Sequence, residues 1–94
     1  MVQTYHSMRP VLINDTNQTI QEVMDSFPVG IHFIQVGQTV SVEIGMPARG
    51  VYGIILFKNS TTYSVVLALP YDGTVEHVYK CSCTAGTWRP WVEI

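Results

Sequence analysis

Two apolar runs on either side of a short polar segment form the centre of this 94-residue chain. The runs, Val51 to Phe57 and Tyr63 to Leu69, are rich in β-branched and aromatic residues and too short for stable helices. They predict two paired strands joined by a polar turn at residues 58–62. Because both runs are apolar at nearly every position, each face of this hairpin needs cover, from the rest of the chain or from another subunit.

The composition indicates more apolar surface than one small core can bury. Hydrophobic residues make up 47% of the chain and charged residues only 13%, about half the share in an average soluble domain. A chain of this length forms a single domain with a small core. The apolar surface that this core cannot bury favours an oligomer or a part of a larger assembly. The net charge of -2 provides no basic field for phosphates, which argues against nucleic-acid binding.

Targeting and metal-binding signals are weak. The sequence shows no basic segment followed by an apolar one at its start, so we expect no signal peptide, and no apolar run is long enough to predict a membrane span. Cys81 and Cys83 would share one strand face, a poor geometry for a disulfide, and they lack a second pair of metal ligands. We expect buried thiols, no metal and no cofactor.

The N-terminal part divides at residue 18. Residues 1–18 show no sustained periodicity and are interpreted as an entry segment, in which residues 11–13 form a short strand or pack as an arm. Residues 19–94 are interpreted as the β domain. This domain begins with a capping box, Thr19 with Glu22, which predicts a short helix from about Ile20 to Ser26.

After the helix the pattern changes to short strands joined by turns. Ile31 to Val36 predicts a strand, and the alternation of Val40, Val42 and Ile44 predicts another. Beyond the central hairpin, we expect a turn at Asp72-Gly73, a strand from Val75 to Cys83, and a last strand from Thr87 to Ile94. The predicted fold is mostly β: a small antiparallel meander or sandwich of about six strands with one short N-terminal helix.

Catalytic patterns are absent from the sequence, so we expect no enzyme. His32 and His77 fall in predicted strands, where a histidine bonded to a neighbour is more common than a ligand or a base. A pair of carboxylates such as Asp72 and Glu76 could in principle flank a glycosidic bond, but two acids beside one turn are more often solvated.

Aromatic side chains near strand ends are the best candidates for ligand contacts. Flat rings next to amide, carboxylate or guanidinium groups suit a saccharide, because the C–H faces of a sugar stack on aromatic rings. The alternative is packing in the core or at a subunit interface, where Tyr and Trp are also enriched. The candidate ligand-binding residues are Asn59, Tyr63, Tyr71, Asp72, Trp88 and Arg89.

The two tryptophans are separated by three positions. In a regular strand Trp88 and Trp91 would face opposite sides, so we expect one to be buried and the other to be available to a partner. Pro90 removes a backbone donor between them, which predicts an edge strand or a bulge.

Several of these motifs together resemble the knob-type receptor-binding tip domains of bacteriophage tail fibres and pyocins. The resemblance covers about residues 20–94, and it is carried by Phe27-Pro28-Val29-Gly30-Ile31, Gly50-Val51-Tyr52-Gly53, Asp72-Gly73, Val78-Tyr79-Lys80 and the ending Gly86-Thr87-Trp88-Arg89-Pro90-Trp91-Val92-Glu93-Ile94. No collagen-like or heptad stalk precedes these motifs in this sequence.

The resemblance implies a homotrimer in the tail of a phage particle, alongside other tail-fibre proteins. It implies recognition of a bacterial surface glycan or another receptor, without membrane insertion. The alternative is a purely structural baseplate or fibre-assembly module, in which the aromatic residues only pack at the contacts between subunits. In either case we expect the central hairpin to contribute both to the subunit core and to the subunit interface.

Overall fold

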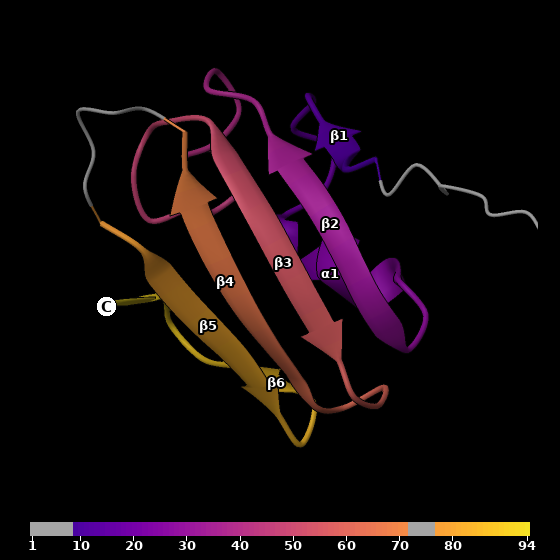
Figure 1. Cartoon of the computed structure of the whole chain (residues 1–94). Helices are drawn as coiled ribbons and strands as arrows, with labels where there is room; N and C mark the ends of the chain where they lie inside the picture. Colours follow the sequence, from indigo (N-terminus) through magenta and orange to yellow (C-terminus); the bar gives the residue numbers. More distant parts are fainter. Residues whose placement is uncertain (1–8, 72–76) are drawn as a thin grey trace, which may run out of the picture.

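The computed structural model describes residues 9–71 and 77–94, whose strands form one sheet (Figure 1). The strands are β1 (Val11–Ile13), β2 (Gly30–Val36), β3 (Tyr52–Lys58), β4 (Ser64–Pro70), β5 (Tyr79–Thr84), β6 (Thr87–Trp88) and β7 (Val92–Glu93). Their spatial order is β1-β2-β3-β4-β5-β6, and β7 also pairs with β5. The helix α1 (Ile20–Ser26) lies behind this sheet. The expected mostly β fold with a short helix is confirmed, with all seven strands of the described residues in a single sheet.

The first strand departs from the expected antiparallel meander. β1 pairs with β2 in parallel, with Val11 opposite Ile34 and Ile13 opposite Val36, and α1 forms the crossover between them. The pairs from β2 to β5 are antiparallel, as expected. Of the two alternatives for residues 11–13, the strand is therefore correct, and part of the entry segment belongs to the sheet.

The predicted helix and its cap are confirmed. The amide of Glu22 donates to Thr19 Oγ1 at 3.1 Å, and the amide of Thr19 donates to Glu22 Oε1 at 2.8 Å. This reciprocal pair satisfies two amides that have no partner within the helix. The apolar side of α1, which includes Ile20 and Met24, is buried in the core.

The central hairpin is confirmed, but its turn begins one residue later than expected. Leu56 of β3 lies opposite Val66 of β4, and both are fully buried. Lys58, which we expected in the polar turn, is the last residue of β3 and only 6% exposed. Its ammonium group satisfies three backbone carbonyls near the end of α1, so burial of this charge is compensated.

The strand expected from Val40 to Ile44 is wrong. Residues 38–45 form turns, in which the amide of Ile44 donates to the carbonyl of Val40 at 3.0 Å. Val40 and Ile44 are buried as expected, whereas Val42 is 57% exposed. Buried positions four residues apart fit both a strand face and one helical turn, which is why the alternation misled the prediction.

Ser41 explains why a turn forms at this point. Its side chain is fully buried, donates to the carbonyl of Gln38 at 2.9 Å and accepts from the amide of Gly50 at 3.1 Å. A hydroxyl that bonds the nearby backbone in this way competes with strand pairing. It ties the two ends of the 38–50 connection together over the sheet.

The C-terminal segment contains two short strands in place of the long strand expected from Thr87 to Ile94. β6 and β7 both pair with β5, and the interruption between them includes Pro90, consistent with the predicted edge position. The expectation of one buried and one available tryptophan is wrong, because Trp88 and Trp91 are both half-buried and both pack against the same core. The interruption removes the strict alternation of a continuous strand, so residues three apart reach the same side.

Candidate interaction surfaces

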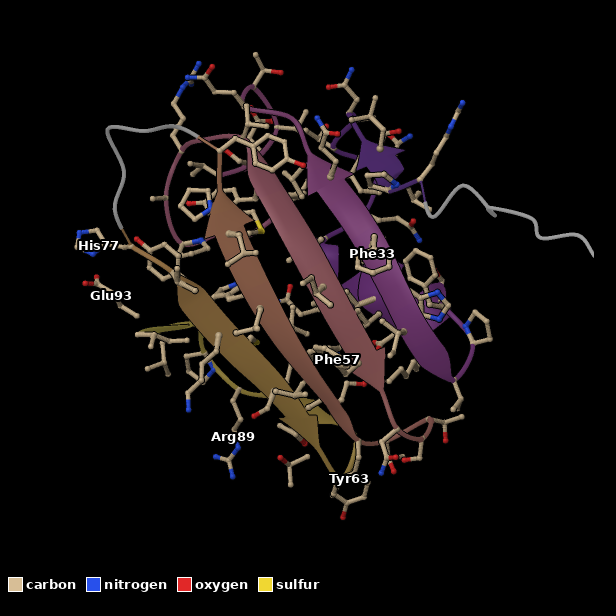
Figure 2. All side chains as sticks on the ribbon, viewed as in Figure 1. Phe33, Phe57, Tyr63, His77, Arg89 and Glu93 are labelled. Carbon is tan, nitrogen blue, oxygen red and sulfur yellow. The ribbon has the colours of Figure 1, made fainter. Side chains whose placement is uncertain are left out.

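One face of the sheet is covered and the other is open. α1, the 38–50 connection and both tryptophans pack on the covered face, around Tyr52, Ile54, Leu56 and Val66. Strand residues alternate between faces, so the neighbours of these core residues project from the opposite side. Figure 2 shows two of them, Phe33 and Phe57, on the side turned away from α1.

The open face is lined by apolar side chains in three adjoining rows. The pairing places Ile31 beside Phe57 and Val65, then Phe33 beside Ile55 and Leu67, with Leu69 in the next row. Ile31 is 59% exposed and Val65 46%. We define the open face by eight residues, the last of which lies on the edge strand β7: Ile31, Phe33, Ile55, Phe57, Val65, Leu67, Leu69 and Val92.

Tyr71 closes one end of the open face. A β-carbon at Gly53 would lie 2.9 Å from the Tyr71 ring, so the ring lies directly over this glycine. Gly53 occupies the position opposite Leu69, in the row next to Leu67. This close approach requires a residue without a side chain at position 53.

Positive charge enters the open face on β5. Lys80 pairs with Leu67 on one side and with Val92 on the other. Lys80 and Arg89 also line a shallow hollow of about 120 Å³, together with Val65, Cys81, Ser82, Pro90 and Val92. The eight residues that define the open face carry no charge, but Lys80 lies in the same row, between Leu67 and Val92.

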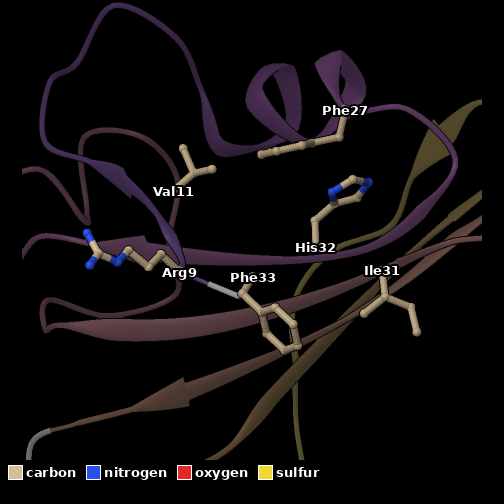
Figure 3. Close-up of a pocket in the computed structure, with 6 residues that line it drawn as sticks. All are labelled: Arg9, Val11, Phe27, Ile31, His32 and Phe33. Atoms are coloured by element: carbon tan, nitrogen blue, oxygen red, sulfur yellow. The ribbon is translucent and has the colours of Figure 1, made fainter. Parts of the chain in front are cut away.

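A second hollow lies at the other edge of the sheet (Figure 3). It measures about 190 Å³ and is lined by Arg9, Val11, Phe27, Ile31, His32 and Phe33. The rings of Phe27 and His32 are 4.6 Å apart, and His32 Nε2 lies 2.7 Å from the carbonyl oxygen of Pro28. The expectation that this strand histidine bonds to a neighbour is confirmed. Both hollows are smaller than the ~300–1,000 Å³ of typical small-molecule pockets, which favours a macromolecular surface.

Two turns meet at the end of the sheet that is remote from Tyr71. The amides of Asn59 and Ser60 both donate to the carbonyl of Tyr63, at 3.0 and 3.2 Å, and the amide of Gly86 donates to the carbonyl of Thr62 at 3.0 Å. We call this region, residues 59–63 with residues 85–86, the turn end. It presents the half-exposed ring of Tyr63 among exposed amide and hydroxyl groups (Figure 2).

The predicted ligand-binding residues do not form one site. Asn59 and Tyr63 lie together at the turn end, whereas Tyr71 follows β4 at the opposite end of the sheet, about 25 Å away for a strand of this length. Asp72 lies outside the described residues. Arg89 lines the hollow beside Lys80.

Trp88 is not available as a free ring on the surface. Its Nε1 donates to Asp25 Oδ1 of α1 at 3.0 Å, and Trp91 Nε1 donates to the carbonyl of Gly45 at 3.1 Å. Both indoles are therefore anchored within the subunit, where each finds the partner that a half-buried indole requires.

The titratable groups of the core are not arranged for catalysis. Cys81 and Cys83 are free and buried, as expected, and burial raises the pKa of the Cys81 thiol to about 11. Burial also raises the pKa of Tyr52, whose hydroxyl donates to the carbonyl of Ala48. Thiols and phenols with raised pKa values stay protonated and make poor nucleophiles. Within residues 9–71 and 77–94, no group of three His, Cys, Asp or Glu side chains could hold a metal ion.

His77 lies before β5, so its expected place in a strand is wrong. Its Nδ1 is 2.7 Å from Glu93 Oε2, and both side chains are 53% exposed (Figure 2). Ion pairs at this exposure contribute at most about 1 kcal/mol. The interaction between His77 and Glu93 therefore contributes little to the stability of the pairing between β7 and β5.

Sequence reasoning did not name the side chains of the open face as site residues. The available signal was the apolar pattern on both sides of the central hairpin, which indicated that a second face of the sheet also has to be buried. Phe33 and Ile31 could not be assigned to that face without the register between β2 and β3.

No helix in the described chain has the length and apolar character needed to cross a membrane. No family model matches the chain, and no curated protein or solved structure matches it significantly. A functional proposal therefore rests on the surfaces described above and on the motifs of the sequence.

Proposed function

We propose that this chain is the receptor-binding tip of a phage or prophage tail fibre, and that it binds a bacterial cell-surface saccharide without catalysing a reaction. The motifs shared with knob-type tip domains support this assignment. They also imply a homotrimer, a location in the virion tail, and other tail-fibre proteins as neighbours. The turn end is the part of the chain that we assign to recognition.

The observation that carries this proposal is the exposed ring of Tyr63 at the turn end, beside the exposed side chain of Asn59. Tyr63 is 48% exposed and its carbonyl is held by two amides of the same turn. Because the turn is fixed by these bonds, and by the bond from Gly86 to Thr62, the ring is presented with little loss of backbone entropy on binding.

The chemistry of the turn end suits a neutral sugar. An exposed phenol ring offers a flat apolar surface to the C–H face of a pyranose, and the side chains of Asn59, Ser60, Thr61 and Thr62 offer donors and acceptors for hydroxyl groups.

A glycan array with the intact chain tests this proposal. We expect binding to one class of bacterial surface glycan, and a loss of affinity of up to about tenfold in Tyr63→Ala, because stacking on one aromatic ring contributes about 0.5–1.5 kcal/mol. Tyr71→Ala is the matched control, since Tyr71 is an exposed tyrosine at the other end of β4. Equal binding by Tyr63→Ala and the wild type would show that recognition lies elsewhere.

A second candidate function is a structural assembly module without a ligand. It is favoured by the two anchored indoles, because Trp88 and Trp91 bond to α1 and to the 38–50 connection rather than facing solvent. This candidate predicts that no glycan raises the melting temperature of the protein. A glycan that raises it, and loses this effect in Tyr63→Ala, would exclude the second candidate.

A further inference from the structure

We infer that the hollow of about 120 Å³ whose lining includes Lys80, Ser82 and Arg89 binds a carboxylate or phosphate group, and that the saccharide recognised at the turn end is acidic. We call this site the β5 hollow. The acidic saccharide rests on the proposed function and names its class of ligand more closely. The anion site itself is independent of saccharide recognition.

The charges of the β5 hollow indicate the sign of the ligand. The described residues that line it contribute two cationic side chains, one hydroxyl group and no carboxylate. Neither Lys80 nor Arg89 takes part in an ion pair within residues 9–71 and 77–94. A guanidinium group can donate two parallel hydrogen bonds to carboxylate or phosphate oxygens, and an ammonium group adds a further charged donor. This combination suits an anion.

Strand β5 brings two of these polar groups to the same side. Cys81 and Cys83 point into the core and are buried, so the alternation of the strand directs Lys80 and Ser82 to the opposite side. Their Cα atoms are roughly 7 Å apart, because each strand residue adds about 3.3 Å. The ammonium and hydroxyl groups can therefore face one ligand.

The backbone of Arg89 is fixed beside β5 by two hydrogen bonds. The amide of Arg89 donates to the carbonyl of Ser82 at 2.8 Å, and the carbonyl of Arg89 accepts from Cys81 Sγ at 3.0 Å. Pro90 follows and restricts the backbone further. Because the base of the arginine side chain is already ordered, an anion has to order only the guanidinium arm, which lowers the entropic cost of binding.

The volume of the β5 hollow selects a small group. About 120 Å³ holds a carboxylate or a phosphate, since one water molecule takes about 30 Å³ in the liquid, but it is too small for a whole drug-sized ligand. Val65, Pro90 and Val92 give the hollow apolar walls, which displace water and strengthen the attraction between charges. The ligand is therefore an anionic substituent on a larger molecule.

The β5 hollow adjoins the turn end. Val65, which lines the hollow, is two residues from Tyr63, so at most about 7 Å separate their Cα atoms. Figure 2 shows Tyr63 and Arg89 toward the same end of the sheet. A short saccharide can therefore place an uncharged ring face on Tyr63 and the acidic group of the same or the next sugar unit in the hollow.

Titration with inorganic phosphate, followed by NMR at constant ionic strength, tests the anion site by itself. We expect phosphate to shift the amide signals of Ser82 and Arg89, and Arg89→Gln to weaken this binding roughly tenfold, because it removes a charged pair of donors. Arg49→Gln is the matched control, since Arg49 is an exposed arginine on the 38–50 connection, and it should leave the affinity unchanged. Phosphate binding that survives Arg89→Gln, or shifts of equal size around both arginines, would overturn the inference.

A second variant guards against misfolding. If circular dichroism shows that Arg89→Gln is unfolded, Lys80→Gln replaces it, because Lys80 is exposed and supplies the other charge of the hollow. The same loss of phosphate affinity is expected, and an unchanged affinity would overturn the inference in this case too.

A glycan array identifies the acidic group and separates this inference from the proposed function. The array presents glycans with uronic acids, glycans with phosphate substituents and neutral glycans of matched backbone. We expect one acidic class to bind, with a roughly tenfold loss in Arg89→Gln and none in Arg49→Gln. Equal binding of acidic and neutral glycans would overturn the acidic saccharide but leave the proposed recognition standing. Phosphate binding in the hollow without binding of any glycan would remove the proposed recognition and leave the anion site standing.

Discussion

The ammonium group of Lys58 donates to the carbonyl oxygen of Phe27 at 2.7 Å, and so joins the end of β3 to the residue that follows α1. It also donates to the carbonyls of Met24 at 3.2 Å and Asp25 at 2.9 Å. The last turn of α1 has no basic residue of its own. Lys58 therefore supplies, from a distant strand, the positive charge and the donors that a helix C-terminus favours.

We expect Lys58→Met to lower the free energy of unfolding by about 2–3 kcal/mol, because three carbonyls lose a charged donor in a buried place. For a domain of this size the melting temperature should fall by on the order of 10 °C. Thermal unfolding at one fixed protein concentration measures the effect. Lys80→Met is the control, because Lys80 is exposed and its replacement should change stability by less than about 0.5 kcal/mol. Equal effects of the two substitutions would contradict this role.

The capping box at the start of α1 makes a smaller contribution. Thr19→Ala removes the acceptor of the Glu22 amide, so we expect the free energy of unfolding to fall by about 1 kcal/mol. Urea unfolding should show a lower midpoint with an unchanged slope, since the same surface is exposed. Thr39→Ala, at an exposed position in the turn that follows β2, should leave the midpoint unchanged.

The bond between Trp88 and Asp25 should couple α1 to the C-terminal segment. Trp88→Phe and Asp25→Ala each break the same 3.0 Å hydrogen bond, so the double variant should lose less stability than the two single variants together. We expect a coupling energy of about 1 kcal/mol from a double-mutant cycle. Trp91→Phe combined with Asp25→Ala is the reference pair, because Trp91 bonds to Gly45 instead, and its effects should add.

Alkaline pH should destabilise the protein through Cys81. Burial raises the pKa of this thiol from 9.0 to about 11, so the folded state holds the proton over a pH range in which the unfolded state releases it. The contribution to stability is complete below pH 9 and is lost as the pH rises from 9 to 11, by on the order of 2 kcal/mol.

Urea unfolding of the wild type and Cys81→Ala at pH 7 and at pH 10.5 measures this loss. The wild type should lose more stability than the variant over this interval, whatever the difference between them at pH 7. Tyr52, whose pKa is also raised by burial, remains in both proteins and cancels in the comparison. An identical pH dependence in both proteins would show that Cys81 is not responsible.

Features formed by neighbouring residues were predictable from the sequence alone. The helix from Ile20 to Ser26, its capping box and the pairing of the central hairpin depend on side chains a few positions apart, whose spacing fixes the local hydrogen bonds. The apolar character of both faces of the hairpin was also visible, and with it the need for cover on a second side. Of the candidate site, Asn59 and Tyr63 could be proposed because an amide and an aromatic ring lie near the adjoining ends of two predicted strands.

Tertiary structure alone decided the features that depend on distant contacts. The sequence marks Val40 and Ile44 as buried, but only the bonds of Ser41 to Gln38 and Gly50 make their segment a turn. Lys58 looks like a turn residue until the end of α1, more than 30 positions away, supplies its three acceptors.

The two tryptophans, for which the sequence predicted opposite sides, reach one side because Asp25 and Gly45 offer partners there. Hydrogen bonds between such distant residues form only once the sheet brings them together, so no local pattern encodes them. The same is true of the two faces of the sheet: the sequence determined that both are apolar, and the path of the chain decided which of them is covered.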